Sequence, residues 1–247
     1  MLPKISIIIA TYNSAAFLER ALRSVKNQIF KGWECIMIDG CSTDDTVDIF
    51  KKFAGNDERF SYISEKDRGV YDAFNKGWQK AKGEWIYYLG SDDELLPNGL
   101  NELLSNSDEK DIIYGGIYTR YKSGKLKKHI PGYWERSMPF QLPCSHQAII
   151  MKRSTIARLG GFNTKYHILA DFDLMNHAFF ADCSTKRVPV PVSIFQLGGM
   201  STDSIKSLRE RYDIHVSYGI SKPRAFAHQF AMFCRFLIYK IKHKWID

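Results

Sequence analysis

The sequence predicts an α/β fold with a mostly parallel central sheet flanked by helices, and three observations lead to this prediction. Short apolar runs alternate with amphipathic stretches of about ten residues in the first part of the chain. The run Trp85–Leu89 is apolar throughout, as expected for a strand buried on both faces. Each apolar run ends in polar side chains, and a chain of 247 residues can bury a sizeable core.

The first part of the chain contains four expected strands, each followed by a polar turn. The strands are expected at residues 5–10, 33–38, 60–64 and 85–89. Between them, apolar side chains recur at helical spacing near residues 17–25, 44–53 and 70–81. Asn13 or Ser14 is expected to cap the first helix, and Thr43 or Asp44 the second. Strands and helices in this alternation form right-handed parallel units.

After Pro97 the pattern changes, and shorter elements follow. We expect a short helix through residue 104, a hairpin at 111–121 and 125–130, strands at 144–151 and 187–195, and helices at 155–159 and from 170. A turn is expected at residues 198–202, and two helical segments form a tail from Ser204.

Polar side chains are expected to gather where the strands end, because parallel strands bring their carboxyl ends to one edge of a sheet. This edge should hold Thr11, Tyr12, Asn13, Asp39, Asp67, Arg68, Asp92 and Asp93. Such groups suit a nucleotide: aromatic and amide surfaces for the base, acids for base N–H or ribose hydroxyl groups, and metal with arginine for the diphosphate. The glycine-rich G-x-G-x-x-G and GxxxxGK[ST] loops are absent, so side chains and metal would hold the nucleotide.

The adjacent acids Asp92 and Asp93 come directly after the fourth expected strand. Two acids at a strand end suit a hard divalent cation that also contacts phosphate oxygens. Alternatively, these residues and Ser91 only turn the chain and cap the helix that Pro97 indicates.

The net charge of +8 is concentrated in the C-terminal tail, where six Lys or Arg from Lys222 onward face one acid, Asp247. In the last expected helix, one face carries Phe226, Phe230, Phe233, Leu237 and Ile241. Arg235 and Lys242 fall opposite, and Trp245 ends the helix. A basic amphipathic helix is typical of a membrane surface, although it also fits a helix packed on its own domain. No nucleic-acid-binding motif accompanies the charge, so no nucleic-acid partner is expected.

The five cysteines form no CxxC pair, which favours a reducing compartment over a disulfide scaffold or a zinc site. Cys144 and His146 form only an isolated C-x-H pair, which is a weak metal signal. The apolar residues near the N-terminus are too few for a signal peptide. We therefore expect a cytoplasmic protein, peripheral on the inner face of the cell membrane if the tail binds lipid.

Four motifs resemble those of the inverting family 2 glycosyltransferases of GT-A fold, in the same order. They are SIIIATYN (6–13), IDGCSTDDT (38–46), DRGVYDAFNKG (67–77) and GEWIYYLGSDD (83–93). The resemblance covers residues 4 to about 200, and within the family it is greatest to bacterial enzymes of exopolysaccharide, capsule and O-antigen synthesis. It implies transfer of a sugar, with Mn²⁺ or Mg²⁺, from a nucleotide-diphosphate sugar (a UDP-sugar in the first instance) to a lipid-linked glycan. Residues 1–95 would then bind the donor, residues 96–203 the acceptor, and residues 204–247 would form the tail.

The resemblance also implies roles for the residues at the strand ends. Thr11, Tyr12 and Asn13 would lie along the base and ribose, and Asp39 would accept a base N–H. Asp67 and Arg68 would close the nucleotide site. Asp92 would face the ribose and Asp93 the metal, whereas Ser91 stands where the family often has a first acid.

Asp171 matches the second acid of the family's E-D motif, which implies the general base, although Ala170 replaces the preceding Glu. Inverting transfer requires such a carboxylate on the face opposite the leaving group. Asp173 is the rival base, but two positions along a helix it should point elsewhere. His146 and Gln147 are candidates for acceptor or donor-sugar contacts, and a structural role for His146 is the alternative.

Two other classes of protein remain open at this stage. A non-catalytic, nucleotide-binding and membrane-docked subunit could result from the missing first acid and the missing Glu. A sugar-phosphate nucleotidyltransferase would use a similar sheet and metal acids, but its glycine-rich first loop is absent here. The sugar, the linkage and the oligomeric state do not follow from the sequence.

Overall fold

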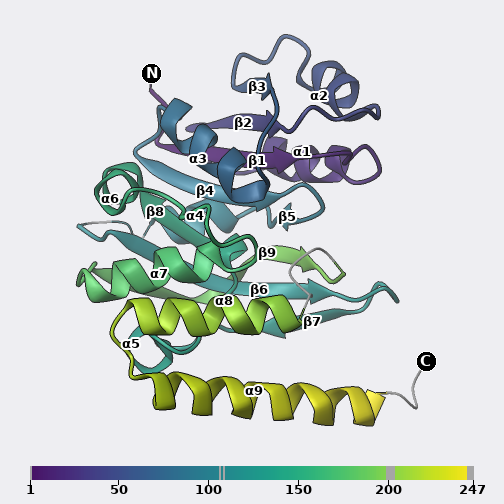
Figure 1. The fold of residues 1–247 in the computed structure, drawn as a ribbon. Helices are drawn as coiled ribbons and strands as arrows, with labels where there is room; N and C mark the ends of the chain where they lie inside the picture. Colours follow the sequence, from purple (N-terminus) through teal and green to yellow (C-terminus); the bar gives the residue numbers. More distant parts are fainter. Residues whose placement is uncertain (1, 106, 108, 199–203, 244–247) are drawn as a thin grey trace.

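The computed structural model describes residues 2–105, 107, 109–198 and 204–243, with the backbone alone for residues 204–205 and 235–243. Its strands are β1 (Ile5–Thr11), β2 (Trp33–Asp39), β3 (Phe60–Ser64), β4 (Trp85–Gly90), β5 (Glu94–Leu95), β6 (Ile112–Arg120), β7 (Leu126–His129), β8 (Ile149–Lys152) and β9 (Thr185–Gln196). They form one sheet in the order β3-β2-β1-β4-β8-β6-β9-β5, with β7 paired to β6 (Figure 1).

Helices cover both faces of this sheet. They are α1 (Leu18–Lys26), α2 (Thr46–Ala54), α3 (Val70–Lys80), α4 (Gly99–Leu104), α5 (Trp134–Ser137), the 3₁₀ helix η1 (His146–Ala148), α6 (Arg153–Leu159), α7 (Ala170–Phe180), α8 (Ser204–Ser217) and α9 (Lys222–His243). Alternate residues of β1 enter two separate cores: Ile7 packs in the core that contains α1 and α4, and Ile8 in the core that contains α3 and α7. The sheet is therefore buried on both faces, as the continuous apolar runs predicted.

The first four strands have the expected parallel arrangement. β1 lies between β2 and β4, and β2 pairs with β3, all in parallel. The register sets Thr11 opposite Asp39 and Asp39 opposite Ser64, and it sets Ala10 opposite Gly90. The carboxyl ends of β1, β2, β3 and β4 therefore meet at one edge, which is where the sequence predicted a site.

Antiparallel pairs enter in the second half of the chain. β8 pairs in antiparallel fashion with both β4 and β6, and so do β6 with β7 and β5 with β9, whereas β6 and β9 are parallel. The sheet is thus mixed, and the predicted α/β class is confirmed. β8 joins the two halves of the chain into one sheet.

Several local predictions were wrong. Neither Asn13 nor Ser14 caps α1 with its side chain, since the helix begins at Leu18 after a turn in which the Ser14 carbonyl accepts the N–H groups of Phe17 and Leu18. Asp44 does accept the N–H of Thr46, where α2 begins. The strand expected at 144–151 is shorter, because residues 146–148 form η1 and only Ile149–Lys152 pair as β8.

The two C-terminal helices lie along the outside of α7, with α9 outermost (Figure 1). α9 packs on the domain through Ala225 and Gln229, which are buried, and through His228, whose ring centroid is 4.9 Å from that of Phe140. Its opposite face exposes Phe226, Phe230 and Phe233. Within the described part of the chain, no helix is long and apolar enough to cross a membrane. The predicted turn at 198–202 lies outside the described residues except for Gly198. So do the side chains of Arg235, Leu237, Ile241 and Lys242, and Trp245.

Candidate active site at the carboxyl edge of the sheet

The carboxylate of Asp39 is the centre of the first part of the site, at the end of β2. It is fully buried and accepts four hydrogen bonds: from Thr11 Oγ1 at 3.0 Å, Ser64 Oγ at 2.7 Å, and Ser42 N and Oγ at 3.0 and 2.5 Å. Burial by itself would raise its pKa, but these hydrogen bonds outweigh burial, so the pKa is lowered and the carboxylate stays ionised. Asp39 thereby ties together the ends of β1, β2 and β3.

Asn13 joins the loop after β1 to the loop after β2. Its backbone N–H donates to Ser42 Oγ at 2.8 Å, and its side-chain oxygen accepts the N–H of Thr43 at 2.9 Å. Its φ of 48° is the left-handed conformation that Asn adopts more readily than most residues. The neighbouring Tyr12 is 65% exposed and thus offers an aromatic surface at this edge. The predicted residues Thr11, Tyr12, Asn13 and Asp39 are therefore adjacent.

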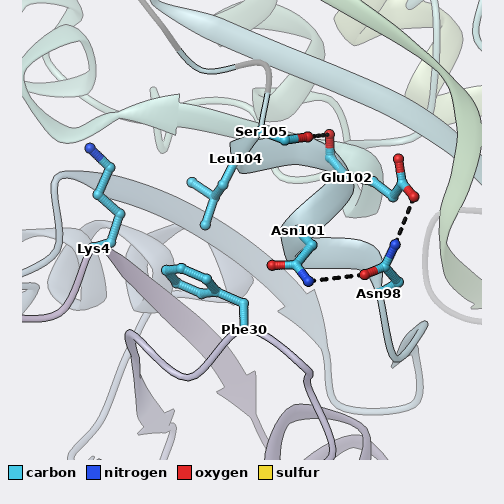
Figure 2. A pocket seen from close by; sticks show the side chains of 7 residues that line it. All are labelled: Lys4, Phe30, Asn98, Asn101, Glu102, Leu104 and Ser105. Carbon is cyan, nitrogen blue, oxygen red and sulfur yellow. Dashed lines mark hydrogen bonds between the residues drawn. The ribbon is translucent and has the colours of Figure 1, made fainter.

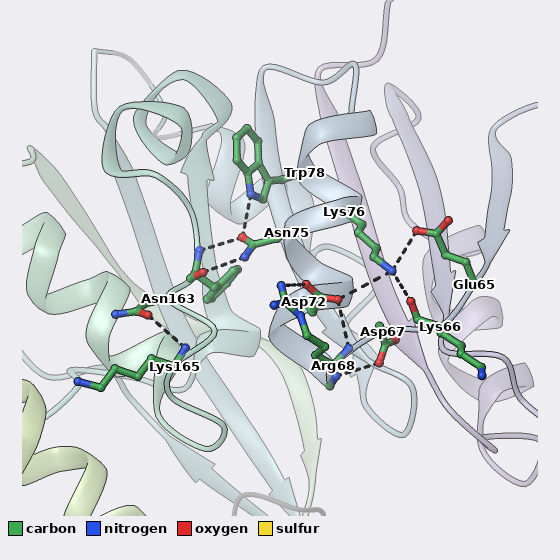
Figure 3. Close-up of polar contacts among 12 residues, drawn as sticks. Glu65, Lys66, Asp67, Arg68, Asp72, Asn75, Lys76, Trp78, Asn163 and Lys165 are labelled. Atoms are coloured by element: carbon green, nitrogen blue, oxygen red, sulfur yellow. Dashed lines mark hydrogen bonds and ion pairs between the residues drawn. The ribbon is translucent and has the colours of Figure 1, made fainter.

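Asp67 and Arg68 lie in the loop before α3, beside the end of β2 (Figure 3). A Cβ on Gly40 would come within 2.7 Å of Asp67 Oδ2, so the absence of a side chain at Gly40 lets Asp67 lie against the residue that follows Asp39. Arg68 is exposed and pairs with Asp72 at 3.1 Å. The Arg68 side chain is 77% exposed, whereas that of Asp72 is only 15% exposed, so turning the guanidinium toward a ligand would break this partly buried ion pair.

Asp93 is almost completely buried at the end of β4, whereas Asp92 is half-buried. A Cβ on Gly90 would lie 2.4 Å from Asp93 Oδ2 and 3.2 Å from Asp92 Oδ1, so both carboxylates lie against this glycine. Arg20 reaches from α1 to the carbonyl of Asp92 at 2.9 Å and also pairs with Glu94. The lack of a side chain at Gly90 is what allows this compact pair of acids.

Burial raises the pKa of Asp93 to about 6, the N–H of Gln196 opposes the rise, and the negative charge of Asp92 adds to it. Hydrogen bonding from Gln147 and the positive field of His146 oppose it further. Asp93, buried with a raised pKa and beside a second acid, has too little positive charge nearby to offset its burial, and a divalent cation would supply that charge. The described residues contain no cluster of three or more His, Cys, Asp or Glu around an ion site.

Asp171 lies in the first turn of α7 and faces His146. Its Oδ2 is 3.2 Å from His146 Nδ1, and its Oδ1 accepts the N–H of Phe172 at 2.8 Å and lies 3.2 Å from the Tyr71 hydroxyl. Burial alone would raise its pKa, but His146 and the other donors lower it. His146 belongs to the second half of the chain, and it acts electrostatically on Asp93 at the end of β4 as well as on Asp171.

Asp173 points away from this site, as the helix geometry predicted. It is buried beside a separate cavity of about 590 Å³, with Tyr218, Asn163 and Lys165. Burial raises its pKa, and the hydrogen bonds of Tyr218 and Asn163 moderate the rise. Asp171 and Asp173 therefore serve two different faces of α7.

Sequence reasoning missed the residues that hold Asp171 in place. Glu210 of α8 accepts the backbone N–H groups of His167, Ile168 and Leu169 at 2.9, 3.0 and 2.9 Å. The next residue, Arg211, lies over the Phe172 ring at 4.4 Å and interacts electrostatically with Asp171. A Glu-Arg pair in a helix gives no sequence signal that it holds a distant acid in place. The packing of α8 is what brings this pair to α7.

A further cavity of about 710 Å³ lies at the opposite, amino-terminal edge of the sheet (Figure 2). It is lined by Lys4 before β1, Phe30 before β2 and residues around α4, including Asn101. Asn98 there bonds to Glu102 at 2.7 Å and to Asn101 at 3.0 Å. None of the predicted site residues lines this cavity, so it is separate from the acids at the carboxyl edge.

The half-parallel mixed sheet, with acids at its carboxyl edge and a further acid from a helix of the second half, agrees with the GT-A fold that the sequence predicted. The family model described as Glycosyl transferase family 2 matches residues 6–167. The chain therefore belongs to glycosyl transferase family 2 and is a glycosyltransferase.

Among curated proteins, the chain is 32% identical over 227 residues to a PGL/p-HBAD biosynthesis glycosyltransferase of Mycobacterium tuberculosis, covering 88% of this chain and 87% of that protein. It is 34% identical over 133 residues to the GalNAc(5)-diNAcBac-PP-undecaprenol beta-1,3-glucosyltransferase of Campylobacter jejuni, covering 53% of this chain and 43% of that enzyme.

Two solved structures share the fold. S. aureus TarS 1-349 in complex with UDP-GlcNAc superposes with a TM-score of 0.72 at 19% identity, covering 97% of this chain and 73% of TarS 1-349. The mannosyltransferase PcManGT of Pyrobaculum calidifontis, in complex with GDP-Man and Mn2+, gives a TM-score of 0.66 at 15% identity, covering 98% and 81%.

Proposed function

We propose that this glycosyltransferase moves a sugar from a UDP-sugar, with inversion, to a hydroxyl group of a lipid-linked glycan in cell-surface polysaccharide synthesis. The observation that carries the proposal is the position of His146: its Nδ1 is 3.2 Å from Asp171 Oδ2, and its charge also acts on Asp93 at the end of β4. In this arrangement Asp93 would serve the leaving diphosphate through a bound cation. Asp171 would serve the acceptor, whose hydroxyl group must lose a proton.

The donor would bind along the ends of the first four strands. Exposed Tyr12 offers a surface for the base, Asn13 and Asp92 are near enough to the same edge to contact the ribose, and Asp67 and Arg68 border it. Asp39 already accepts four hydrogen bonds from Thr11, Ser42 and Ser64, so it would accept the base N–H only in place of one of these donors. UDP is favoured because a structural neighbour binds UDP-GlcNAc.

Asp93, with Asp92 beside it, would hold Mn²⁺ or Mg²⁺. Such ions commonly bind one or two carboxylates together with substrate phosphates, and the bound ion would supply positive charge for the departing diphosphate. The remaining chemistry belongs to the chain: deprotonation of the acceptor depends on Asp171, and Gln147 and His146 border the donor sugar and the acceptor.

The acceptor and the location are inferred from two observations. The Campylobacter relative is named for a PP-undecaprenol acceptor. In this chain, α9 exposes Phe226, Phe230 and Phe233 next to the exposed cations Lys222 and Arg224. An aromatic face bordered by positive charge suits the surface of an anionic membrane, so we infer that the protein is peripheral on the cytoplasmic face.

A non-catalytic nucleotide-binding subunit is the competing proposal. It is favoured by Gly90 and Ser91 before Asp92, and by Ala170, which is fully buried where the family's motif has an acid. A nucleotidyltransferase finds less support, because the first loop is held by Asn13 and Ser42 instead of glycines.

The experiment that tests the proposal is calorimetric titration with UDP, GDP and dTDP, each with and without Mn²⁺, followed by sugar transfer to a polyprenyl-diphosphate-linked saccharide. We expect one nucleotide to bind tightly only with metal, and the matching nucleotide sugars to support transfer. Nucleotide binding without transfer or donor hydrolysis would establish the non-catalytic alternative. Absence of nucleotide binding would overturn the donor site.

A further inference from the structure

His146 is held in a fixed position between two strands by the residue that follows it. The backbone carbonyl of Gln147 accepts the hydroxyl groups of Tyr87 and, at 2.6 Å, Ser193. Tyr87 lies on β4 and Ser193 on β9, so the short helix η1 is fastened to both halves of the sheet. The His146 side chain is still 27% exposed, which leaves it accessible to a substrate.

The two nitrogen atoms of the His146 ring have different surroundings. Nδ1 is 3.2 Å from Asp171 Oδ2, and Nε2 has no recorded protein partner among the described residues. A carboxylate beside Nδ1 selects the tautomer with its proton on Nδ1, which leaves the lone pair of Nε2 free. The arrangement has the geometry of a carboxylate–imidazole pair, in which the acid orients the base.

Asp171 is better suited to orienting a base than to taking a proton itself. Its Oδ1 is occupied by the N–H of Phe172 and by Tyr71, and Oδ2 faces His146. Hydrogen bonds and the charge of His146 hold its pKa low against the effect of burial, and the Arg211 guanidinium also favours the ionised form. A carboxylate stabilised in this way is a weak base but a strong partner for an imidazolium.

We infer that the acceptor proton passes to Nε2 of His146, and that Asp171 is the carboxylate that orients His146 and stabilises its charged form. This inference rests on the proposed sugar transfer. The acceptor O–H bond breaks and its proton moves to Nε2, while an oxygen lone pair forms the new bond to the anomeric carbon. The bond from that carbon to the diphosphate breaks, and its electron pair leaves with the diphosphate oxygen.

The groups around His146 are consistent with this step. Asp171 lies on its Nδ1 side, the negative charge of Asp93 acts from the donor half, and the Phe74 ring, with its centroid 6.4 Å away, covers part of the imidazole. The imidazolium that forms would therefore have two carboxylates in its neighbourhood. The Arg211 guanidinium interacts with Asp171 as well, so the negative charge of Asp171 is shared between the two cations.

The discriminating variant is His146→Gln, because glutamine can still donate a hydrogen bond to Asp171 but cannot accept the proton. We expect UDP affinity within about threefold of the wild type and a fall in the transfer rate at saturating donor of about 100-fold or more. His146→Ala should lose transfer similarly and regain at least about tenfold of it with added imidazole. His129→Ala, on the exposed strand β7, is the matched control and should respond to neither test.

The assay uses the full chain, the UDP-sugars of glucose, galactose and their N-acetyl forms, and a polyprenyl-diphosphate-linked saccharide. Transfer by His146→Gln within about threefold of the wild type would overturn the inference and return the proton to Asp171. Failure of imidazole to restore His146→Ala, when that variant still binds UDP, would also overturn it. If the wild type neither binds UDP nor transfers sugar, it is the proposed function that fails.

Discussion

The backbone N–H of Gln196 donates a 2.8 Å hydrogen bond to Asp93 Oδ1, although the two residues are 103 positions apart. Gln196 ends β9 and Asp93 follows β4, so the contact joins an acid at the end of β4 to the end of the last strand. This hydrogen bond offsets only part of the unfavourable burial of the Asp93 carboxylate, because burial still raises its pKa to about 6.

Asp93→Asn is expected to stabilise the metal-free protein while it abolishes metal-dependent UDP binding. The pKa of Asp93 is near 4 in the unfolded chain and about 6 in the folded protein, so between these pH values the folded protein binds more protons. The free energy of unfolding of the wild type therefore falls as the pH rises from about 4 to about 6 and stays lower above about pH 6. Asparagine carries no charge, and we expect a gain of about 1–3 kcal/mol near pH 7.5 that shrinks toward pH 4. Urea unfolding in EDTA measures the gain. A less stable variant near pH 7.5 would contradict the argument, and Asp92→Asn is the half-buried control.

Asp171→Asn is expected to bind UDP normally and to transfer sugar about 10²–10⁴ times more slowly, because the amide cannot stabilise the positive charge that forms. Transfer rates and calorimetry on the same preparation measure the two effects. Asp173→Asn is the control, since this acid faces the other side of α7 and should leave the transfer rate nearly unchanged. If Asp171→Asn transfers sugar at the wild-type rate, Asp171 has no role in the reaction.

Glu210→Ala is expected to loosen the loop before α7 and to slow transfer without weakening UDP binding. The carboxylate accepts three backbone N–H groups, which would be left without this partner, and we expect a loss of about 2–4 kcal/mol of stability. Glu210→Gln should fall between the wild type and Glu210→Ala. Urea unfolding and transfer rates test this, with Glu19→Ala as the exposed control. Equal stability of Glu210→Ala and Glu19→Ala would show that α8 does not hold this loop.

Replacing Phe226, Phe230 and Phe233 together by serine is expected to weaken binding to anionic vesicles by about tenfold or more. The three side chains are 65%, 59% and 37% exposed, so their loss should hardly change the unfolding transition. Co-sedimentation with vesicles of phosphatidylglycerol measures binding. Ile29→Ser removes an equally exposed apolar side chain elsewhere and should have no effect. Unchanged vesicle binding by the triple variant, or by a chain lacking residues 222–247, would exclude α9 as the membrane contact.

Periodicity and strand-end chemistry were sufficient to predict the fold of the first four strands. A buried parallel strand is apolar throughout and must end in polar residues, so the alternation of runs located β1 to β4 and brought Thr11, Asp39 and Asp93 to one edge. Helix geometry likewise separated Asp171 from Asp173, because residues two positions apart in a helix point in different directions. These inferences needed only local pattern and known geometry.

Tertiary structure decided what the local pattern could not express. The antiparallel insertion of β8 between β4 and β6, the 3₁₀ turn that aims His146 at Asp171, and the Glu210 carboxylate over residues 167–169 all depend on contacts between distant segments. Each is a hydrogen bond or packing contact whose partner is set by the folded chain, so no spacing in the sequence reveals it. The sequence by itself determined the fold class, the family and the acids, whereas the pairing of those acids with His146, Gln196 and Glu210 arose only when the two halves of the sheet packed together.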